Sequence, residues 1–247
     1  MKDSVFEIMY AGHALRYSFR DVNTRWEFRS LARRSSAETW DIRATKEQLE
    51  RTRTVLPEDS RDAFVEYRAL IGLTARELLK YDCCIFHGVS FVWKGAAFLL
   101  TAPSGVGKST QFFNWQRMFP GEIAMICGDM PTLERREDGS VWAHPSPWNG
   151  KERLGDRRLC GPVAGIVLLE QGSENSISPL SPHDAITPFF GQFLVRPETE
   201  EEIRALARLM DQTLRNVPLY KLVNLGDDAS TALLRETLSP LAEGGSP

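Results

Sequence analysis

The chain of 247 residues lacks features that would place it in several large classes of protein. It has 30 Lys and Arg against 33 Asp and Glu, a net charge of −3, whereas general nucleic-acid binders carry a basic surplus. No apolar run approaches the roughly 20 residues that a membrane-spanning helix needs. Met1 is followed by mixed polar sequence rather than an apolar leader. We therefore expect a cytoplasmic protein with no nucleic acid and no membrane as partner.

Cysteine is scarce, with four residues in the whole chain. Cys83 and Cys84 are adjacent, so on a strand they would point to opposite faces of the sheet. Neither they nor Cys127 and Cys160 show the spacing of a zinc site. The sequence therefore predicts reduced thiols, in keeping with a cytoplasmic location.

Short apolar strands alternate with helices from residue 81 onwards, which favours an α/β sandwich. Strands are predicted at 81–86, 89–93, 96–101, 123–127, 131–134, 140–143, 163–170 and 217–222. Helices are predicted at 108–118, 182–190, 200–215 and from about 228 to 238. The fold class is therefore α/β, with residues 81–247 as one nucleotide-binding domain.

Residues 1–80 have a different pattern and predict a small strand-plus-helix region attached to that domain. Residues 5–10 and 26–31 read as strands because they are rich in apolar and aromatic side chains. Residues 59–80 read as a helix, because Phe64, Tyr67 and Leu70 recur at helical spacing.

Residues 98–110 are the most informative segment of the chain. An apolar strand leads into the turn Ala-Pro-Ser-Gly-Val-Gly, and Lys-Ser-Thr then opens a helix. Backbone N–H groups of such a turn surround a phosphate, and the helix N-terminus adds positive potential. Ala102 stands where the usual first glycine would be, which is tolerable if that residue needs no positive φ. The predicted nucleotide-binding residues are Ser104, Gly105, Val106, Gly107, Lys108, Ser109 and Thr110.

Asp129 follows the apolar strand 123–127 and is a candidate magnesium ligand or general base. The carboxyl ends of parallel strands share one edge of a sheet, so Asp129 is expected near the phosphate turn. The alternative is an ordinary turn aspartate. His87 lies upstream in an apolar segment, where a single histidine is more often a hydrogen-bonded core residue.

Residues 145–153 combine prolines, a tryptophan and charges, and suit the lip of a substrate site. Trp148 would be an aromatic platform, and Lys151 and Arg153 would attract phosphate or carboxylate groups, with Glu152 between them. The alternative is a solvated charged turn with Trp148 packed as a lid.

These motifs together resemble the serine kinases of the HPr kinase/phosphorylase type. The resemblance rests on His87-Gly88-Val89, the run from Pro103 to Ser109 and the strand that ends in Asp129. It covers residues 85–130 closely. It implies a P-loop-containing mixed-sheet sandwich like that shared with phosphoenolpyruvate carboxykinases.

The resemblance also implies phosphoryl transfer from ATP to a serine hydroxyl with Mg²⁺ as cofactor. Lys108 would then neutralise the β- and γ-phosphates, Ser109 and Asp129 would hold the metal, and His87 would lie beside the transferred group. The family has an Asp-Asp pair at the strand end, and here Gly128 replaces the first member. Asp129 alone, or another acid such as Glu152, would have to act as the base.

The expected activity is an ATP- and Mg²⁺-dependent serine kinase that acts on a peptide, a protein or free serine. Its short relatives suggest ribosomally made peptide precursors among the acceptors. Two alternatives stay open: a nucleotide-binding sensor or assembly module with little catalysis, and a small-metabolite kinase. The chain has no Asn-Lys-x-Asp motif of GTPases and no Leu-Ser-Gly-Gly-Gln signature of ABC ATPases. The acceptor and the oligomeric state are not determined by the sequence.

Overall fold

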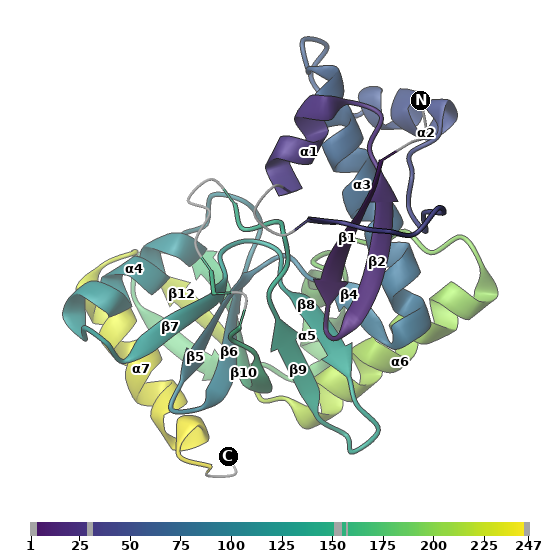
Figure 1. Ribbon diagram of the computed structural model, residues 1–247. Coiled ribbons are helices and arrows are strands. Elements are labelled where there is room, and N and C mark those ends of the chain that lie inside the picture. Colours follow the sequence, from purple (N-terminus) through teal and green to yellow (C-terminus); the bar gives the residue numbers. More distant parts are fainter. Residues whose placement is uncertain (1–3, 29–31, 151–154, 157, 245–247) are drawn as a thin grey trace.

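The computed structural model describes residues 4–28, 32–150, 155–156 and 158–244 (Figure 1). Near the N-terminus, β1 (Val5–Tyr10) and β2 (His13–Ser18) form an antiparallel hairpin, and β3 (Arg33–Arg34) pairs with the other edge of β1. Ala11 and Gly12 both have positive φ, 46° and 83°, as a two-residue hairpin turn requires. The strand predicted at 5–10 is thus confirmed, and its partner β2 was not predicted.

Three helices accompany this small sheet: α1 (Val22–Phe28), α2 (Lys46–Arg53) and α3 (Asp62–Leu78), the last followed by the short 3₁₀ helix η1 (Leu79–Tyr81). The strand predicted at 26–31 is wrong, because residues 22–28 are helical and residues 29–31 lie outside the described residues. Thr24 and Phe28, four residues apart, are both fully buried, so one helical face packs inward.

The second sheet has nine strands of mixed direction; the mixed direction is what the motif resemblance implies, and the strand at Ser176–Pro179 was not predicted. Its strands are β4 (Cys83–Ile85), β5 (Val89–Trp93), β6 (Ala96–Thr101), β7 (Ile123–Cys127), β8 (Thr132–Arg135), β9 (Val141–His144), β10 (Gly161–Gln171), β11 (Ser176–Pro179) and β12 (Leu219–Asn224). The main order is β4-β8-β9-β10-β6-β5-β7, and β12 pairs with β10 and β11. The long strand β10 therefore joins the antiparallel part, β4-β8-β9, to the part that carries β6 and β12.

Helices cover both faces of this sheet, so the α/β sandwich is confirmed (Figure 1). The helices are α4 (Lys108–Met118), α5 (Pro182–Phe190), α6 (Glu200–Asn216) and α7 (Asp228–Ala242). Phe98 and Leu100 of β6 pack with Trp115 of α4 and Leu238 of α7 in one cluster. The intervening side chains of β6 belong to a second cluster on the opposite face, which includes residues of α5 and α6.

The second cluster also contains buried residues of the N-terminal region. Ile8 and Tyr10 of β1 and Leu70 of α3 belong to it together with Phe86 and Ile126. One hydrophobic core thus spans the boundary at residue 80, and the division of the chain into domains at that point stays a prediction.

Among the described residues, none of the helices is both long enough and apolar enough to span a bilayer.

Candidate phosphate-binding and catalytic site

The carboxyl ends of four strands, β6, β7, β10 and β12, lie at the same edge of the large sheet as the start of β5. Strands β6, β10 and β12 are parallel, and β5 runs antiparallel to both β6 and β7. The carboxyl ends of β6 and β7 therefore share an edge with the start of β5. This geometry brings the phosphate turn after β6, Asp129 after β7 and His87 before β5 to the same place.

The turn between β6 and α4 has the local geometry that the sequence predicts. Gly105 and Gly107 have φ of 85° and 111°, which L side chains rarely adopt, whereas Ala102 has no positive φ. Ala102 is fully buried in the cluster beneath α4, so its methyl group fills core space. Gly107 is the N-cap of α4 and supplies no side-chain cap, which leaves the first N–H groups of the helix available to an anion.

Buried polar contacts fasten α4 to the neighbouring strand and helix. The Nε2 group of Gln111 donates to Asn224 Oδ1 (3.3 Å) and Ser230 Oγ (2.7 Å), and Thr231 Oγ1 donates to Gln111 Oε1 (2.7 Å). Asn224 in turn donates to the carbonyl of Glu170 on β10 (3.0 Å). The turn is therefore followed by a helix whose position is fixed by hydrogen bonds to β12 and α7.

Lys108 is buried, and its side chain bends back over the turn. Its ammonium donates to the carbonyl oxygens of Ala102 (2.9 Å) and Pro103 (3.3 Å). Burial lowers the pKa of Lys108, and the carboxylate of Asp129 opposes that shift. A desolvated cation whose hydrogen bonds go to carbonyl oxygens gains from a new anionic partner.

His87 and Asp129 face each other, with His87 Nε2 at 3.6 Å from Asp129 Oδ1. Their backbones are joined as well, because the N–H of Gly88 donates to the carbonyl of Asp129 (2.7 Å). A Cβ on Gly88 would lie 2.9 Å from the carbonyl oxygen of Leu100, so only glycine allows β6 to approach this closely. Thr101 Oγ1 also donates to the carbonyl of His87 (2.8 Å).

The electrostatic surroundings of His87 favour the neutral ring. Burial lowers the pKa of His87, the Lys108 cation lowers it further, and Arg68 adds to that shift. The hydrogen bond to Gln192 and the Asp129 carboxylate act in the opposite direction and do not prevail. His87, Lys108 and Asp129, the three candidate catalytic residues, thus form one mutually interacting group.

The loop that carries Asp129 is tied to residues 146–148. Met130 N donates to the carbonyl of Trp148 (3.1 Å), and Ser146 Oγ donates to the carbonyl of Met130 (2.5 Å). The buried thiol of Cys127 lies 3.6 Å from the same Trp148 carbonyl. These contacts set the position of Asp129 from both sides.

Trp148 is fully buried, and the structure therefore does not present it as an open aromatic platform. Its ring stacks on Tyr10 of β1 (5.9 Å between centroids) and meets Phe28 of α1 edge to face (5.8 Å). Its surroundings are those of a core residue, in line with the alternative of a packed tryptophan. Lys151, Glu152 and Arg153, the other expected substrate residues, lie outside the described residues.

The donor atoms of Ser109 and Asp129 suit a hard cation. Hydroxyl and carboxylate oxygens are the ligands that Mg²⁺ prefers, and nucleotide enzymes bind it through one or two protein groups plus phosphate oxygens. Groups of three or more His, Cys, Asp and Glu arranged for a metal do not occur in the described part of the chain. The residues present therefore fit a metal that arrives with a nucleotide better than a resident metal centre.

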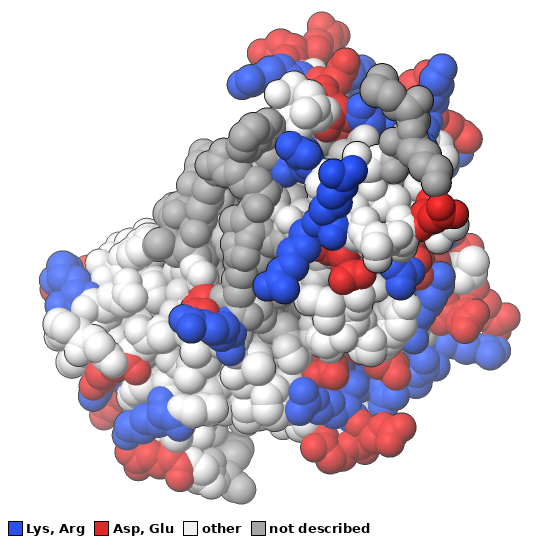
Figure 2. Space-filling view, in the orientation of Figure 1, with Lys and Arg blue, Asp and Glu red and all other residues white. Residues whose placement is uncertain are grey.

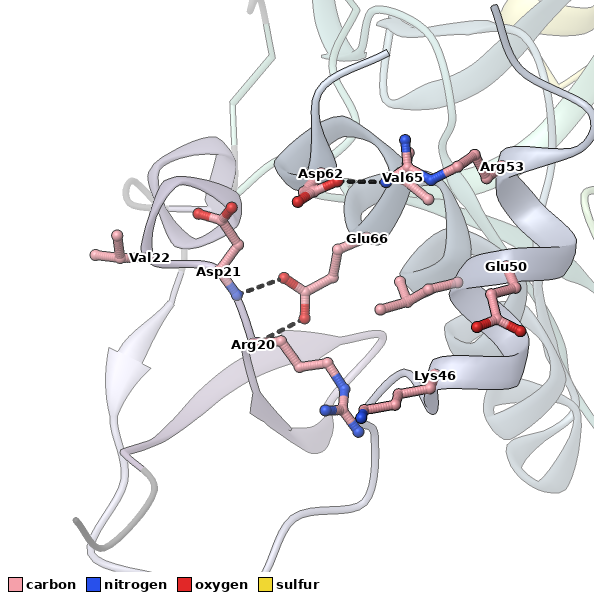
Figure 3. Close-up of a pocket in the computed structure, with 10 residues that line it drawn as sticks. Arg20, Asp21, Val22, Lys46, Glu50, Arg53, Asp62, Val65 and Glu66 are labelled. Atoms are coloured by element: carbon pink, nitrogen blue, oxygen red, sulfur yellow. Dashed lines mark hydrogen bonds and ion pairs between the residues drawn. The ribbon is translucent and has the colours of Figure 1, made fainter. Parts of the chain in front are cut away.

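A separate pocket of about 540 Å³ lies in the N-terminal region and has no lining residue from the site (Figure 3). The buried carboxylate of Glu66 forms part of its wall and accepts from the backbone N–H groups of Arg20 (2.6 Å) and Asp21 (2.9 Å). Arg53 and Asp62 pair with each other at its edge. These charges hold the turn after β2 and the start of α3 in place.

On the face that Figure 2 presents, the described charged residues of one sign do not gather in a single patch. Figure 2 shows Lys and Arg interspersed with Asp and Glu over the face that it presents. This distribution agrees with the net charge of −3 and with the absence of a basic surplus in the sequence.

Comparison with known proteins gives a distant structural likeness. No protein-family model matches the chain, and no curated protein matches it. Among solved structures, the Hpr(Ser) kinase/phosphatase from Coxiella burnetii matches with a TM-score of 0.28 and 10% sequence identity, over 65% of this chain and 95% of that one. A likeness at this level does not assign the chain to that family.

Several residues that build the site were not predicted. Gln192 follows α5 and bonds the His87 ring, and Asn224 at the end of β12 lies beside Gly107. The sequence offers a weak signal for Asn224, which is a polar residue at a strand end. It offers none for Gln192, whose contact depends on how α5 packs.

Proposed function

We propose that this protein is an ATP- and Mg²⁺-dependent phosphotransferase that transfers the γ-phosphate to a hydroxyl group. The observation that carries the proposal is the meeting of Lys108, His87 and Asp129 beside a glycine-containing turn at a helix N-terminus. Phosphoryl transfer depends mainly on positioning and charge neutralisation, and these groups supply both.

Each residue has a distinct role in this proposal. The N–H groups of residues 104–110 would bind the phosphates, and Lys108 would exchange its carbonyl contacts for phosphate oxygens. Ser109 and Asp129 would hold Mg²⁺, which neutralises charge on the phosphates when it is bound. The Asp129 carboxylate would accept the proton of the attacking hydroxyl, with His87 beside it.

The acceptor we propose is a serine hydroxyl, either in a peptide or protein, including a ribosomally made precursor peptide, or in free serine. This choice of acceptor rests on the resemblance of the motifs to the serine kinases. None of the described residues distinguishes among these acceptors. A small metabolite with a hydroxyl group would use the same machinery.

A second candidate is a nucleotide-binding module that senses or assembles without efficient transfer. Gly128 favours it, because only one carboxylate remains where the motif has a pair. Such a module would keep the phosphate turn and the contacts of Lys108 and lack turnover.

The experiment is a transfer assay with γ-labelled ATP, Mg²⁺ and three acceptors: free serine, serine-containing peptides and the protein itself. We expect catalytic label transfer to at least one of them. Asp129→Asn should abolish it, whereas Asp138→Asn, in an exposed turn outside the site, should not. Binding of ATP without label transfer to any acceptor would support the sensor instead.

A further inference from the structure

Gln192 is the residue that connects α5 to His87. It follows the end of α5, and its own N–H donates to the carbonyl of Phe189 (3.0 Å). Beyond it, the chain runs antiparallel to the segment before His87, with a bridge between Phe86 and Phe193. The N–H of His87 donates to the carbonyl of Gln192 (2.7 Å), so the backbones of the two residues are in register.

The side-chain amide of Gln192 has one defined orientation. Its Nε2 group donates to the carbonyl of Pro188 (3.3 Å), one turn back in α5. The amide oxygen is thereby turned toward the His87 ring, where Oε1 lies 2.9 Å from Nδ1. An amide oxygen only accepts, so Nδ1 must carry the hydrogen, and the network assigns the ring as the Nδ1–H tautomer.

The Nδ1–H tautomer determines which groups the other ring nitrogen, Nε2, can bind. In a neutral ring with hydrogen on Nδ1, Nε2 has a free lone pair. That lone pair faces Asp129 Oδ1 at 3.6 Å, and a carboxylate oxygen is an acceptor too. A hydroxyl group placed between these two acceptors would supply one hydrogen, which either of them can accept.

We propose that Gln192 is a positioning residue that holds His87 as the Nδ1–H tautomer, so that Nε2 and the Asp129 carboxylate together receive the acceptor hydroxyl. The part about the hydroxyl rests on the proposed phosphotransfer function. The part about the tautomer rests on the contacts of Gln192 alone. Gln192 is 8% exposed, so water does not substitute for its amide oxygen.

The tautomer is measured by nitrogen NMR on protein labelled with ¹⁵N-histidine, at a mildly alkaline pH where the rings are neutral. The chain has four histidines, and comparison with a His87→Asn sample assigns the His87 signals. We expect hydrogen on Nδ1 in the wild-type protein. Hydrogen on Nε2 in the wild-type protein would overturn the proposal, and this measurement needs no variant of Gln192.

Two variants at position 192 test whether the Gln192 side chain holds the hydrogen on Nδ1 of His87. Gln192→Leu keeps the size of the side chain and removes the acceptor, so the Asp129 carboxylate becomes the remaining partner and hydrogen should move to Nε2. Gln192→Glu keeps an oxygen acceptor at the same place, and hydrogen should stay on Nδ1. Gln212→Leu is the matched control, because Gln212 of α6 bonds the carbonyls of Arg136 and Ser140 and does not contact His87.

Turnover tests separately whether Nε2 of His87 takes part in receiving the acceptor hydroxyl. We expect Gln192→Leu to lower kcat about 10²-fold, with the KM for ATP unchanged, and Gln212→Leu to leave kcat unchanged. A changed tautomer with full kcat would overturn the role of Nε2 in receiving the hydroxyl. If no acceptor is phosphorylated by the wild-type protein while the tautomers behave as expected, the phosphotransfer function fails and the assignment of Gln192 stands.

Discussion

The ammonium group of Lys108 lies 2.9 Å from the carbonyl oxygen of Ala102, the residue that stands in place of the usual first glycine of a phosphate turn. Ala102 is fully buried and has no positive φ, so the alanine is compatible with this geometry. The variant residue therefore changes the packing beneath the turn and not the path of its backbone.

Replacing Lys108 with methionine should weaken nucleotide binding while preserving the fold. A hydrogen-bonded charge contributes about 1.5–3 kcal/mol, which corresponds to a loss of about 10- to 100-fold in affinity for ATP. Calorimetric titration with ATP measures this loss of affinity. Lys46→Met, at the exposed start of α2, is the control and should bind as the wild type does. Equal affinity in the two variants would show that Lys108 does not reach the phosphates.

Two glycines should respond in opposite directions to alanine. Gly107 has φ of 111°, so Gly107→Ala strains the turn at a cost of about 1–3 kcal/mol. Gly72 lies in α3 with open space around its Cβ position, so Gly72→Ala should raise the free energy of unfolding by about 0.5–1 kcal/mol. Urea titration measures both. If Gly107→Ala left the free energy of unfolding unchanged, the turn would have another conformation.

Trp148 should behave as a core residue. Trp148→Ala removes a fully buried ring that packs on Tyr10 and Phe28, and should lower the free energy of unfolding by about 3–5 kcal/mol. Trp40, which is 40% exposed, offers the comparison, and Trp40→Ala should cost much less. Chemical denaturation followed by circular dichroism reports both. If Trp148→Ala were as mild as Trp40→Ala, the ring would not be part of the core.

His144 should make the protein less stable at acidic pH. Its Nε2 lies 2.9 Å from Glu134 Oε2, yet burial outweighs this contact and lowers the pKa of His144. The folded state then binds the proton less readily than the unfolded chain does. The free energy of unfolding should therefore fall as the pH drops below the ordinary histidine value of about 6.5.

The variant that checks this is His144→Gln, which removes the titrating group. Urea midpoints measured from neutral to mildly acidic pH should decline less steeply than in the wild type. His183→Gln changes an exposed ring, 93% accessible in its side chain, and should leave the slope as it is. A His144→Gln protein with the wild-type slope would contradict the expectation.

Local sequence patterns predicted most of the elements from residue 81 onwards. The helices at 108–118 and 182–190 begin and end where the sequence places them, because the signals that bound them, such as the glycine turn before Lys108 and the Ser181 cap with Pro182, act within a few positions. The N-terminal region was predicted less well. Residues 26–31 have the composition of a strand, and the tertiary packing of Phe28 makes a helix of residues 22–28 instead.

The sequence by itself determined the phosphate turn, since the glycines and the helix start that shape it are neighbours in the chain. It also led to the expectation that Asp129 lies near this turn, since it follows a strand, whereas the place of His87 was expected only from the motif resemblance. The tertiary structure alone decided that Gln192 bonds the His87 ring and that Trp148 is buried against Tyr10 and Phe28. The physical reason is separation along the chain: Gln192 and His87 are 105 residues apart, and the pairing of the segment after α5 with the segment before His87 brings their side chains together.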